Sequence, residues 1–234
     1  MSVDKLVGGL LPYLTCIVFI LGIAYRVSRW NRASVTRMPL FPIPSGRAQK
    51  WSQIAKEVLI FKGPLDGDKS LWIGTWIFHA TLALVLVGHL GIVTDFPRLW
   101  NALAHKKGEI DAVAAIASGC AGVILMATGL YLLFRRLAVL RVREISSFED
   151  YASIALVLAV VLTGDIMRFG SQFDLNPVRE YFKALFYLRS APVPSDPWFL
   201  LHFFLAQLLI MYIPFSKFLH IPGIFYSKSL LWQK

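Results

Sequence analysis

The sequence predicts an all-α integral membrane protein, a bundle of five transmembrane helices. Apolar residues make up 56% of the 234 residues, and charged residues make up only 16%, against about 25% in soluble domains. One soluble core of this length cannot enclose so much apolar side chain. In addition, five stretches approach the roughly 20 apolar residues that a helix needs to cross a bilayer. They are residues 6–25, 71–94, 112–134, 151–169 and 198–215.

The first stretch, residues 6–25, is predicted to be a transmembrane helix and not a cleaved signal peptide. Asp4 and Lys5 cancel, so the stretch has no basic start. Tyr25 and Arg26 follow it in place of the small residues of a cleavage site. We expect residues 1–234 to form a single membrane domain.

A long loop, residues 26–70, separates the first two helices and contains three prolines followed by a helix-like stretch, about 47–61. In this stretch apolar residues recur at spacings of three and four, which predicts one apolar face beside several lysines. Two interpretations fit: a helix that lies on the membrane surface, or a docking site for a cytoplasmic partner. The apolar residues are Trp51, Ile54, Val58 and Phe61.

The distribution of Lys and Arg predicts the orientation of the bundle. Nine of the 24 basic residues fall in residues 26–70, four in 135–149 and three in the tail after residue 215, and these segments share one side. Basic loops face the cytoplasm, so we expect the N-terminus outside and the C-terminus in the cytoplasm. The net charge of +10 is then a property of membrane loops, and we expect no nucleic-acid partner.

Four of the five histidines fall in or next to two of the predicted helices. His79 and His89 lie in the second helix, and His202 lies in the fifth helix with His220 just beyond it. Ionisable residues within a membrane are costly and are functional candidates. Since the two helices run in opposite directions, His89 is expected at the level of His202 and His79 at the level of His220. The fifth, His105, falls in an outer loop.

Paired imidazoles on facing helices predict haem binding. A structural zinc site needs four ligands, whereas haem iron accepts one axial ligand on each side and its flat macrocycle suits a bundle interior. No CxxCH sequence is present, so covalent attachment is excluded. Two pairs at two depths therefore predict two b-type haems, with His79 and His220 on the inner iron and His89 and His202 on the outer iron. Small residues that admit a porphyrin include Gly88 and Gly91, together with Gly74.

This pattern resembles the cytochrome b gamma subunit family of respiratory nitrate reductase, which includes membrane subunits of heterodisulfide reductase and of complexes associated with sulfite reduction. The resemblance covers nearly the whole chain. It rests on two histidines ten residues apart on the second helix and two histidines eighteen apart around the fifth. The Gly88–His89 pair and the run 215–220 also resemble motifs of the family.

The resemblance implies a di-haem subunit of a respiratory complex in the cytoplasmic membrane. Such a subunit passes electrons between menaquinone or another quinone near the outer face and an iron–sulfur subunit on the cytoplasmic side, in either direction. The proline-broken first loop ending in residues 66–68 favours the disulfide- and sulfite-linked branch, with a heterodisulfide-reductase-like partner. The nitrate reductase type, with a beta-like partner, comes next.

Two further groups of residues are candidates for the site. Anionic haem propionates need donors, for which Arg168, Lys217, Arg26 and Arg29 are placed at the helix ends, with Arg98, Arg179, Arg135 and Arg136 as further candidates. Asp165 lies one turn before Arg168 and could pair with it. The polar wall of a quinone site is expected in the loop 95–111, from Asp95, His105, Lys106 and Lys107.

Two other functions fit parts of the sequence. In one, the chain is a membrane anchor whose haems are structural, which predicts the same sequence. In the other, it is a transporter whose histidines contact substrate; that class predicts inverted repeats or helices broken at mid-membrane, and the sequence shows neither.

Overall fold

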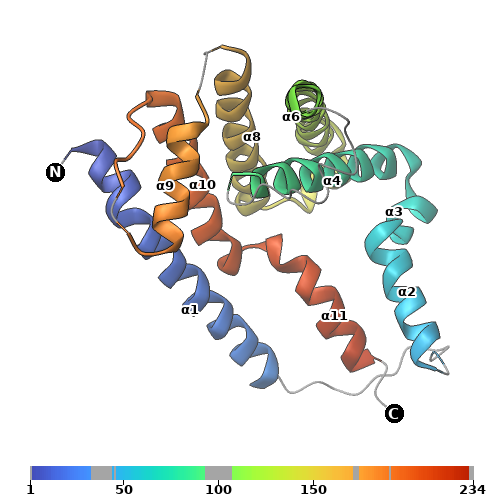
Figure 1. The fold of residues 1–234 in the computed structure, drawn as a ribbon. Helices are drawn as coiled ribbons and strands as arrows, with labels where there is room; N and C mark the ends of the chain where they lie inside the picture. Colours follow the sequence, from blue (N-terminus) through green and yellow to red (C-terminus); the bar gives the residue numbers. More distant parts are fainter. Residues whose placement is uncertain are drawn as a thin grey trace.

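The computed structural model describes residues 2–32, 44, 46–92, 107–170, 174–189 and 191–231, with the backbone alone for 107–115, 221 and 229–231. All the regular secondary structure of the described chain is helical (Figure 1). Its elements are the π-helix η1 (Lys5–Leu10), α1 (Leu11–Arg32), α2 (Arg47–Leu59), α3 (Lys62–Gly67), α4 (Lys69–Leu90), α6 (Lys107–Ala138), α7 (Leu140–Glu144), α8 (Phe148–Phe169), α9 (Asn176–Phe186), α10 (Pro197–Tyr212), the 3-10 turns η2 (Ile213–Phe215) and η3 (Lys217–Leu219), and α11 (His220–Leu231).

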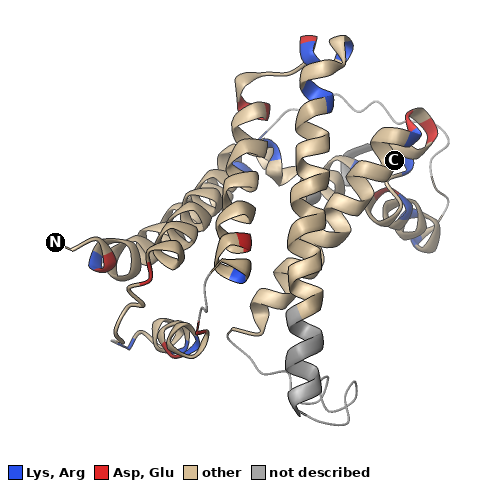
Figure 2. Cartoon of the chain, turned by 90° about the horizontal axis from the view of Figure 1, so that it is seen from above, with Lys and Arg blue, Asp and Glu red and all other residues tan. Residues whose placement is uncertain are grey.

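Five helical segments within the described residues are long and apolar enough to cross a membrane, as the sequence predicts. Figure 2 shows that charged residues gather toward the helix ends and leave the middle of the long helices uncharged. The chain is therefore an all-helical multi-pass membrane protein. The segments are Lys5–Arg32, Lys69–Leu90, Ile116–Ala138, Phe148–Phe169 and Pro197–Phe215.

Short polar side chains begin three of these helices. Asp68 accepts a hydrogen bond from the Leu71 amide at the start of α4, and Asp196 accepts one from the Phe199 amide at the start of α10, both at 2.9 Å. At the start of α8, Ser147 and Asp150 form a reciprocal capping box. These bonds satisfy amides that have no partner in the first turn of a helix.

In the described part of the chain, the five spanning helices pack one on the next without closing into a ring. α4 packs on α6, α6 on α8, α8 on α10, and α10 on α1 (Figure 1). α4 and α10 do not pack closely against each other in the described part of the chain. α6 and α8 thus lie between α4, which carries His79 and His89, and α10, which carries His202.

Two helices end earlier than the sequence predicts. The helix expected over 71–94 ends at Leu90, where Gly91 and Ile92 form a turn. The helix expected over 198–215 is α-helical only to Tyr212. Pro214 has no amide hydrogen to continue it, so residues 213–215 form a 3-10 turn and Ser216 is extended. α11 then leaves in a different direction from α10 (Figure 1). His202 therefore lies in α10 and His220 begins α11, and the turn at Pro214 separates the two.

Helices α9 and α11 were not expected from the sequence. α9 follows the fourth spanning helix, and its apolar residues Val178, Tyr181, Phe182 and Leu185 recur at helical spacing. Val178 and Tyr181 are buried against Phe199 of α10. Such a short amphipathic helix has too few apolar residues to stand out beside the spanning helices.

The predicted helix in the first loop, α2, is fastened to two other helices. The indoles of Trp72 and Trp76 on α4 donate to the carbonyls of Ile60 and Leu59, at 2.6 Å and 3.0 Å. Glu57 accepts a hydrogen bond from Lys228 of α11 at 2.7 Å, and the Trp51 ring packs near the Phe225 ring. Part of the predicted apolar face of α2 thus contacts α11 of the same chain.

α1 approaches the end of α10 closely at Gly22, which is buried. A β-carbon at this position would lie 2.6 Å from Cβ of Pro214. Because that distance is shorter than a van der Waals contact, only glycine permits the approach of the two helices here.

We expect Gly22→Ala to lower stability by about 1–3 kcal/mol, since the added methyl group forces two packed backbones apart. Thermal unfolding in detergent micelles measures the change. Gly9→Ala is the matched control in the same membrane segment, because a β-carbon at Gly9 meets nothing within 4 Å. Equal melting temperatures for the two variants would contradict the close approach.

Asp68 gives the start of α4 a dependence on pH. Hydrogen bonds from the Leu71 amide and the Ser70 hydroxyl, together with the Arg135 guanidinium, lower the pKa of Asp68 from 3.8 to about 2. A lowered pKa stabilises the folded state fully above pH 3.8, and this stabilisation disappears as the pH falls toward 2.

Asp68→Asn keeps a capping side chain but removes the charge and the ion pair with Arg135. We expect the melting temperature of the wild type to exceed that of Asp68→Asn near pH 6, and the difference to shrink as the pH is lowered from 4 toward 2. Thermal unfolding of both proteins across this range tests it. A difference that does not change with pH would show that the carboxylate charge is not involved.

Candidate functional site

The structure brings His79, His89, His202 and His220 together in two pairs. The rings of His79 and His220 have centres 6.0 Å apart and planes at 90°. The rings of His89 and His202 have centres 6.2 Å apart and planes at 17°. We refer to these as the 79/220 pair and the 89/202 pair, and to the two ends of the bundle by the same numbers.

Each of the four rings directs its Nδ1 atom to a backbone carbonyl oxygen. His79 and His89 contact the carbonyls of Thr75 and Val85 one turn earlier, both at 2.8 Å. His220 contacts that of Lys217 at 3.1 Å, and His202 contacts that of Val160 on α8 at 3.0 Å. A carbonyl oxygen only accepts hydrogen bonds, so Nδ1 carries the proton in every ring. In this tautomer of the neutral ring, Nε2 is the nitrogen that can bind a metal.

The spacing within each pair fits one metal between two axial imidazoles. An imidazole nitrogen lies about 2.0–2.1 Å from a bound metal, so two rings on opposite sides have centres roughly 6–6.5 Å apart. No group of three or more His, Cys, Asp or Glu side chains that could hold a metal forms among the described residues. Two ligands at each level match the axial requirement of haem iron.

A cavity of about 690 Å³ adjoins the 79/220 pair. α4 and α11 contribute its histidines, and the connection from α2 to α3 forms the opposite wall. In this wall Phe61 has a left-handed backbone, with φ of 52°, and its ring contacts that of His79 at 5.0 Å. The wall also carries Glu57, Lys62 and Asp66. The cavity provides room for a large planar group beside the two imidazoles.

Glycines distinguish the surroundings of the 89/202 pair. A β-carbon on Gly88 would meet nothing within 4 Å, so the face of α4 next to His89 is open. Gly164 of α8 lies under the His202 ring, where a β-carbon would come within 3.3 Å of it. Gly91 ends α4. Gly74, also expected near a porphyrin, instead accommodates the Tyr131 ring of α6, because a β-carbon there would lie 2.3 Å from that ring.

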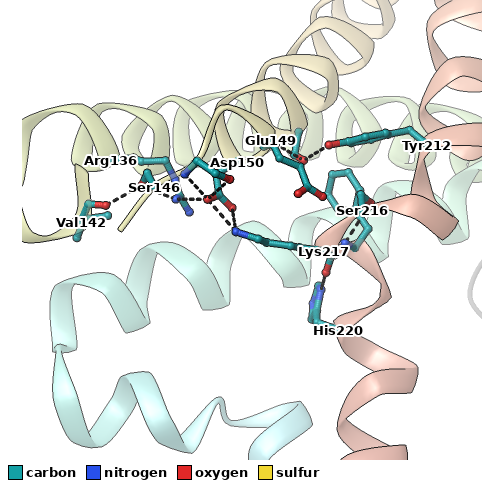
Figure 3. Close-up of polar contacts among 12 residues, drawn as sticks. Arg136, Val142, Ser146, Glu149, Asp150, Tyr212, Ser216, Lys217 and His220 are labelled. Atoms are coloured by element: carbon teal, nitrogen blue, oxygen red, sulfur yellow. Dashed lines mark hydrogen bonds and ion pairs between the residues drawn. The ribbon is translucent and has the colours of Figure 1, made fainter. Parts of the chain in front are cut away.

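An ion-pair network supports the 79/220 pair (Figure 3). The carboxylate of Asp150 on α8 accepts two hydrogen bonds from the Lys217 ammonium, both at 2.9 Å. Arg136 of α6 lies 3.5 Å from the same carboxylate and donates to the Ser146 hydroxyl. The backbone carbonyl of Lys217 holds His220. Three helical segments therefore converge on the turn that orients this imidazole.

The predicted propionate donors have different surroundings. Arg26 has a buried Nε that makes no hydrogen bond with the described residues, as a donor awaiting an anion would. Arg29 lies over the Tyr25 ring at 6.0 Å, and Lys217 is bound to Asp150. Arg168 lies beside Gly119 of α6. Contacts of these side chains with a propionate remain predictions.

Some predicted partners of these side chains differ in the structure. Asp165 and Arg168 form no ion pair among the described contacts. The Asp165 carboxylate instead lies against Gly122 of α6, whose missing side chain makes room for it. Arg135 is paired with Asp68, and Arg179 has a buried Nε without a hydrogen-bond partner in the described chain.

The predicted quinone-site residues fall outside the described part of the chain. Asp95, His105 and Lys106 lie outside the described residues, as does Arg98. Lys107 begins α6, but its side chain is not described. Their expected role remains a prediction.

Three residues of the site were missed by sequence reasoning. Thr163 lies with its hydroxyl 3.0 Å from Nδ1 of His202, Phe61 contacts His79, and Asp150 organises the ion-pair network. Of the three, only Asp150 could have been noticed in the sequence. A serine followed three residues later by an acidic residue, as Ser147 is by Asp150, is a capping pattern at the start of a helix. The contacts of the other two depend on tertiary packing.

We expect Asp150→Ala to weaken haem retention at the 79/220 pair by about tenfold or more, because outer-shell partners of this kind typically contribute that much. Haem content after dilution in detergent, with a redox titration that separates the two centres, provides the measurement. Thr163→Val is the matched control and should affect only the 89/202 pair. Loss from both sites in either variant would indicate a general folding defect.

The comparison with known proteins agrees with the resemblance noted in the sequence. The chain is similar to the Hdr-like menaquinol oxidoreductase cytochrome b-like subunit of Archaeoglobus fulgidus, with 26% identity over 95% of this chain and 78% of that protein. It is similar to the nitrate reductase gamma chain of Bacillus subtilis, with 26% identity over 93% of this chain and 90% of that protein.

A third relative comes from Methanosarcina barkeri. It is a component of the dihydromethanophenazine:CoB–CoM heterodisulfide reductase of that organism, and it is 25% identical over 90% of this chain and 86% of that protein. The sequence profile described as nitrate reductase gamma subunit matches residues 64–232, a range that contains both histidine pairs. By this match over more than half of its length, the chain belongs to the nitrate reductase gamma subunit family.

Proposed function

We propose that this chain is the di-haem b membrane subunit of a respiratory oxidoreductase complex. It transfers electrons between a menaquinone pool at the 89/202 end and an iron–sulfur subunit at the 79/220 end. The names of the relatives in three kinds of complex support a role as a subunit with these classes of partner.

The hydrogen bonds and the pairing of four imidazoles support the proposal. All four place a proton on Nδ1 by bonding to a carbonyl, and all four leave Nε2 for a ligand. The two pairs have ring centres 6.0 Å and 6.2 Å apart. Helix-to-helix hydrogen bonding alone does not call for four rings in the same tautomer, facing in pairs at a separation that fits one metal.

The residues of the chain have defined roles in this function. His79 and His220 would hold one haem, and His89 and His202 the other. Each haem, when bound, supplies a one-electron redox centre. The apolar helices would keep water away from both, and Thr163 and the Lys217 carbonyl hold the rings of His202 and His220. Arg26, whose buried Nε has no hydrogen-bond partner among the described residues, would bind an anionic propionate.

The basic residues support an orientation of the chain in the membrane, and the long first loop supports a type of partner. The 79/220 end carries α2, α3 and the segment 135–149, which contain several Lys and Arg residues, and because basic segments favour the cytoplasmic side we infer that this end faces the cytoplasm of a cytoplasmic membrane. α2 and α3 lie at this end and wall the cavity beside His79. We favour a heterodisulfide-reductase-like iron–sulfur partner, because this long loop is typical of that branch, and a nitrate-reductase-beta-like partner next.

The test is the haem content of the purified chain and its single histidine variants, measured by pyridine haemochrome and reduced-minus-oxidised spectra. We expect two b haems in the wild type. His89→Ala and His202→Ala should lose the same haem, and His79→Ala and His220→Ala the other, because each iron needs both ligands.

His105→Ala is the control and should retain both haems, since His105 belongs to neither pair. Addition of menaquinol should then reduce the wild-type haems, and an iron–sulfur acceptor should reoxidise them. A well-folded wild type without haem would refute the assignment. Two haems that neither accept electrons from quinol nor pass them on would make the chain an anchor with structural haems.

A further inference from the structure

A second cavity, of about 340 Å³, lies at the 89/202 end between η1, α9 and the segment that follows α9. Its volume falls within the range of about 300–1,000 Å³ that is typical of small-molecule sites. None of its residues belongs to the loop 95–111. Its walls include Gly9, Tyr13, Tyr181, Leu185, Leu188 and Arg189.

The wall chemistry is that of a site for a flat amphipathic ring. Tyr13 and Tyr181 contribute two aromatic faces, Leu185 and Leu188 contribute apolar contacts, and Arg189 contributes one cation. The Tyr181 hydroxyl donates to the Gly8 carbonyl at 2.6 Å, and burial raises its pKa to about 12, so it remains protonated. Among the described residues, neither the Tyr13 hydroxyl nor the Arg189 guanidinium has a hydrogen-bond partner, and the guanidinium lies 5.6 Å from the centre of the Tyr187 ring.

Aromatic rings connect this cavity to the 89/202 pair. The Tyr181 ring, which lines the cavity, contacts the Phe203 ring at 6.1 Å. Phe203 directly follows His202 on α10 and stacks on Phe199 at 5.6 Å. Val193, another wall residue, packs on the same cluster. The Tyr181 ring therefore lies between the cavity and Phe203, the sequence neighbour of the proposed haem ligand His202.

The backbone at the cavity is unusual on both sides. The π-helical turn Lys5–Leu10 supplies Gly8 and Gly9, and π-turns occur frequently at functional sites. Leu188, on the opposite wall, has a φ of 53°. Among the described non-glycine residues, positive φ occurs only at Leu188 and at Phe61, which lines the cavity of the 79/220 pair. Backbone strain of this kind clusters at ligand sites.

An apolar stripe runs along α1 from the cavity. Leu10, Leu14, Ile17 and Leu21 recur at helical spacing. All four residues are exposed, with between 45% and 63% of their surface accessible. This stripe offers an isoprenoid tail a continuous apolar surface within the membrane.

We propose that this cavity binds the ring of an isoprenoid quinone, with the tail along α1. This inference rests on the proposed function and identifies a binding site for its quinone. Two hydrogen-bond donors match the two carbonyl oxygens of a quinone. A phospholipid phosphate would favour a cluster of cations, and Arg189 is the one cation in this wall.

Gly9→Leu is the decisive variant, because it fills the cavity without displacing the fold. A β-carbon at Gly9 meets nothing within 4 Å, and the same holds for Gly46 at the other end of the molecule, so Gly46→Leu is the matched control. Arg189→Gln and Tyr13→Phe provide milder changes that remove one donor each. Dithionite-reduced spectra and haemochrome content confirm that every variant carries its haems.

The readout is the initial rate of haem reduction by menadiol, together with calorimetric titration by menadione. We expect Gly9→Leu to lower the rate and the menadione affinity by at least about tenfold, equivalent to about 1.4 kcal/mol, and Arg189→Gln to lower both less. Gly46→Leu should match the wild type. A Gly9→Leu protein with wild-type rate and affinity would overturn the inference.

Two further outcomes separate this inference from the proposed function. A wild type that lacks haem but binds menadione, with binding lost in Gly9→Leu, supports the cavity and refutes the haem assignment. Phospholipid that co-purifies with the wild type and is lost in Gly9→Leu, at an unchanged menadiol rate, identifies a lipid site and refutes the quinone. Because the titration needs no haem, it tests the cavity in either case.

Discussion

A hydrogen bond from Nδ1 of an imidazole to a backbone carbonyl recurs at all four intramembrane histidines, and the geometry of the site depends on it. The bond fixes both the rotation of the ring and the position of its proton. In three cases the acceptor lies three or four residues earlier in the chain, so ordinary helical geometry supplies it. His202 is the exception, since its acceptor Val160 belongs to α8. Its orientation therefore depends on the packing of α8 against α10.

Much of the fold was predictable because membranes impose strict requirements. A spanning segment needs about 20 apolar residues in a helix, and five such segments stand out in the sequence and in the structure. The pairing of the histidines by level followed from the alternating direction of consecutive spans. The contacts of His79 with His220 and of His89 with His202 are the ones that this reasoning expects.

Features that depend on tertiary contacts were not predictable. The sequence places His220 just beyond the fifth helix but does not predict α11, which takes a new direction after the turn at Pro214. The role of Asp150 depends on Lys217 and Arg136, which come from distant parts of the sequence. Gly74 was assigned to a porphyrin by composition, whereas the packing of Tyr131 explains it. In each case the local sequence allows several partners, and the packing selects one.

With haem bound as proposed, the separation of α4 from α10 links the stability of this chain to the supply of haem. The His89 ring of α4 meets the His202 ring of α10, and the His79 ring of α4 meets the His220 ring of α11, while α4 and α10 do not pack closely in the described chain. A haem held by each pair would supply contacts that these helices do not make with each other. A ligand that binds only the folded form adds stability by mass action. A cell short of haem would then hold this subunit as an unfinished bundle, open to membrane proteases. Its abundance would follow cofactor biosynthesis without any dedicated regulator.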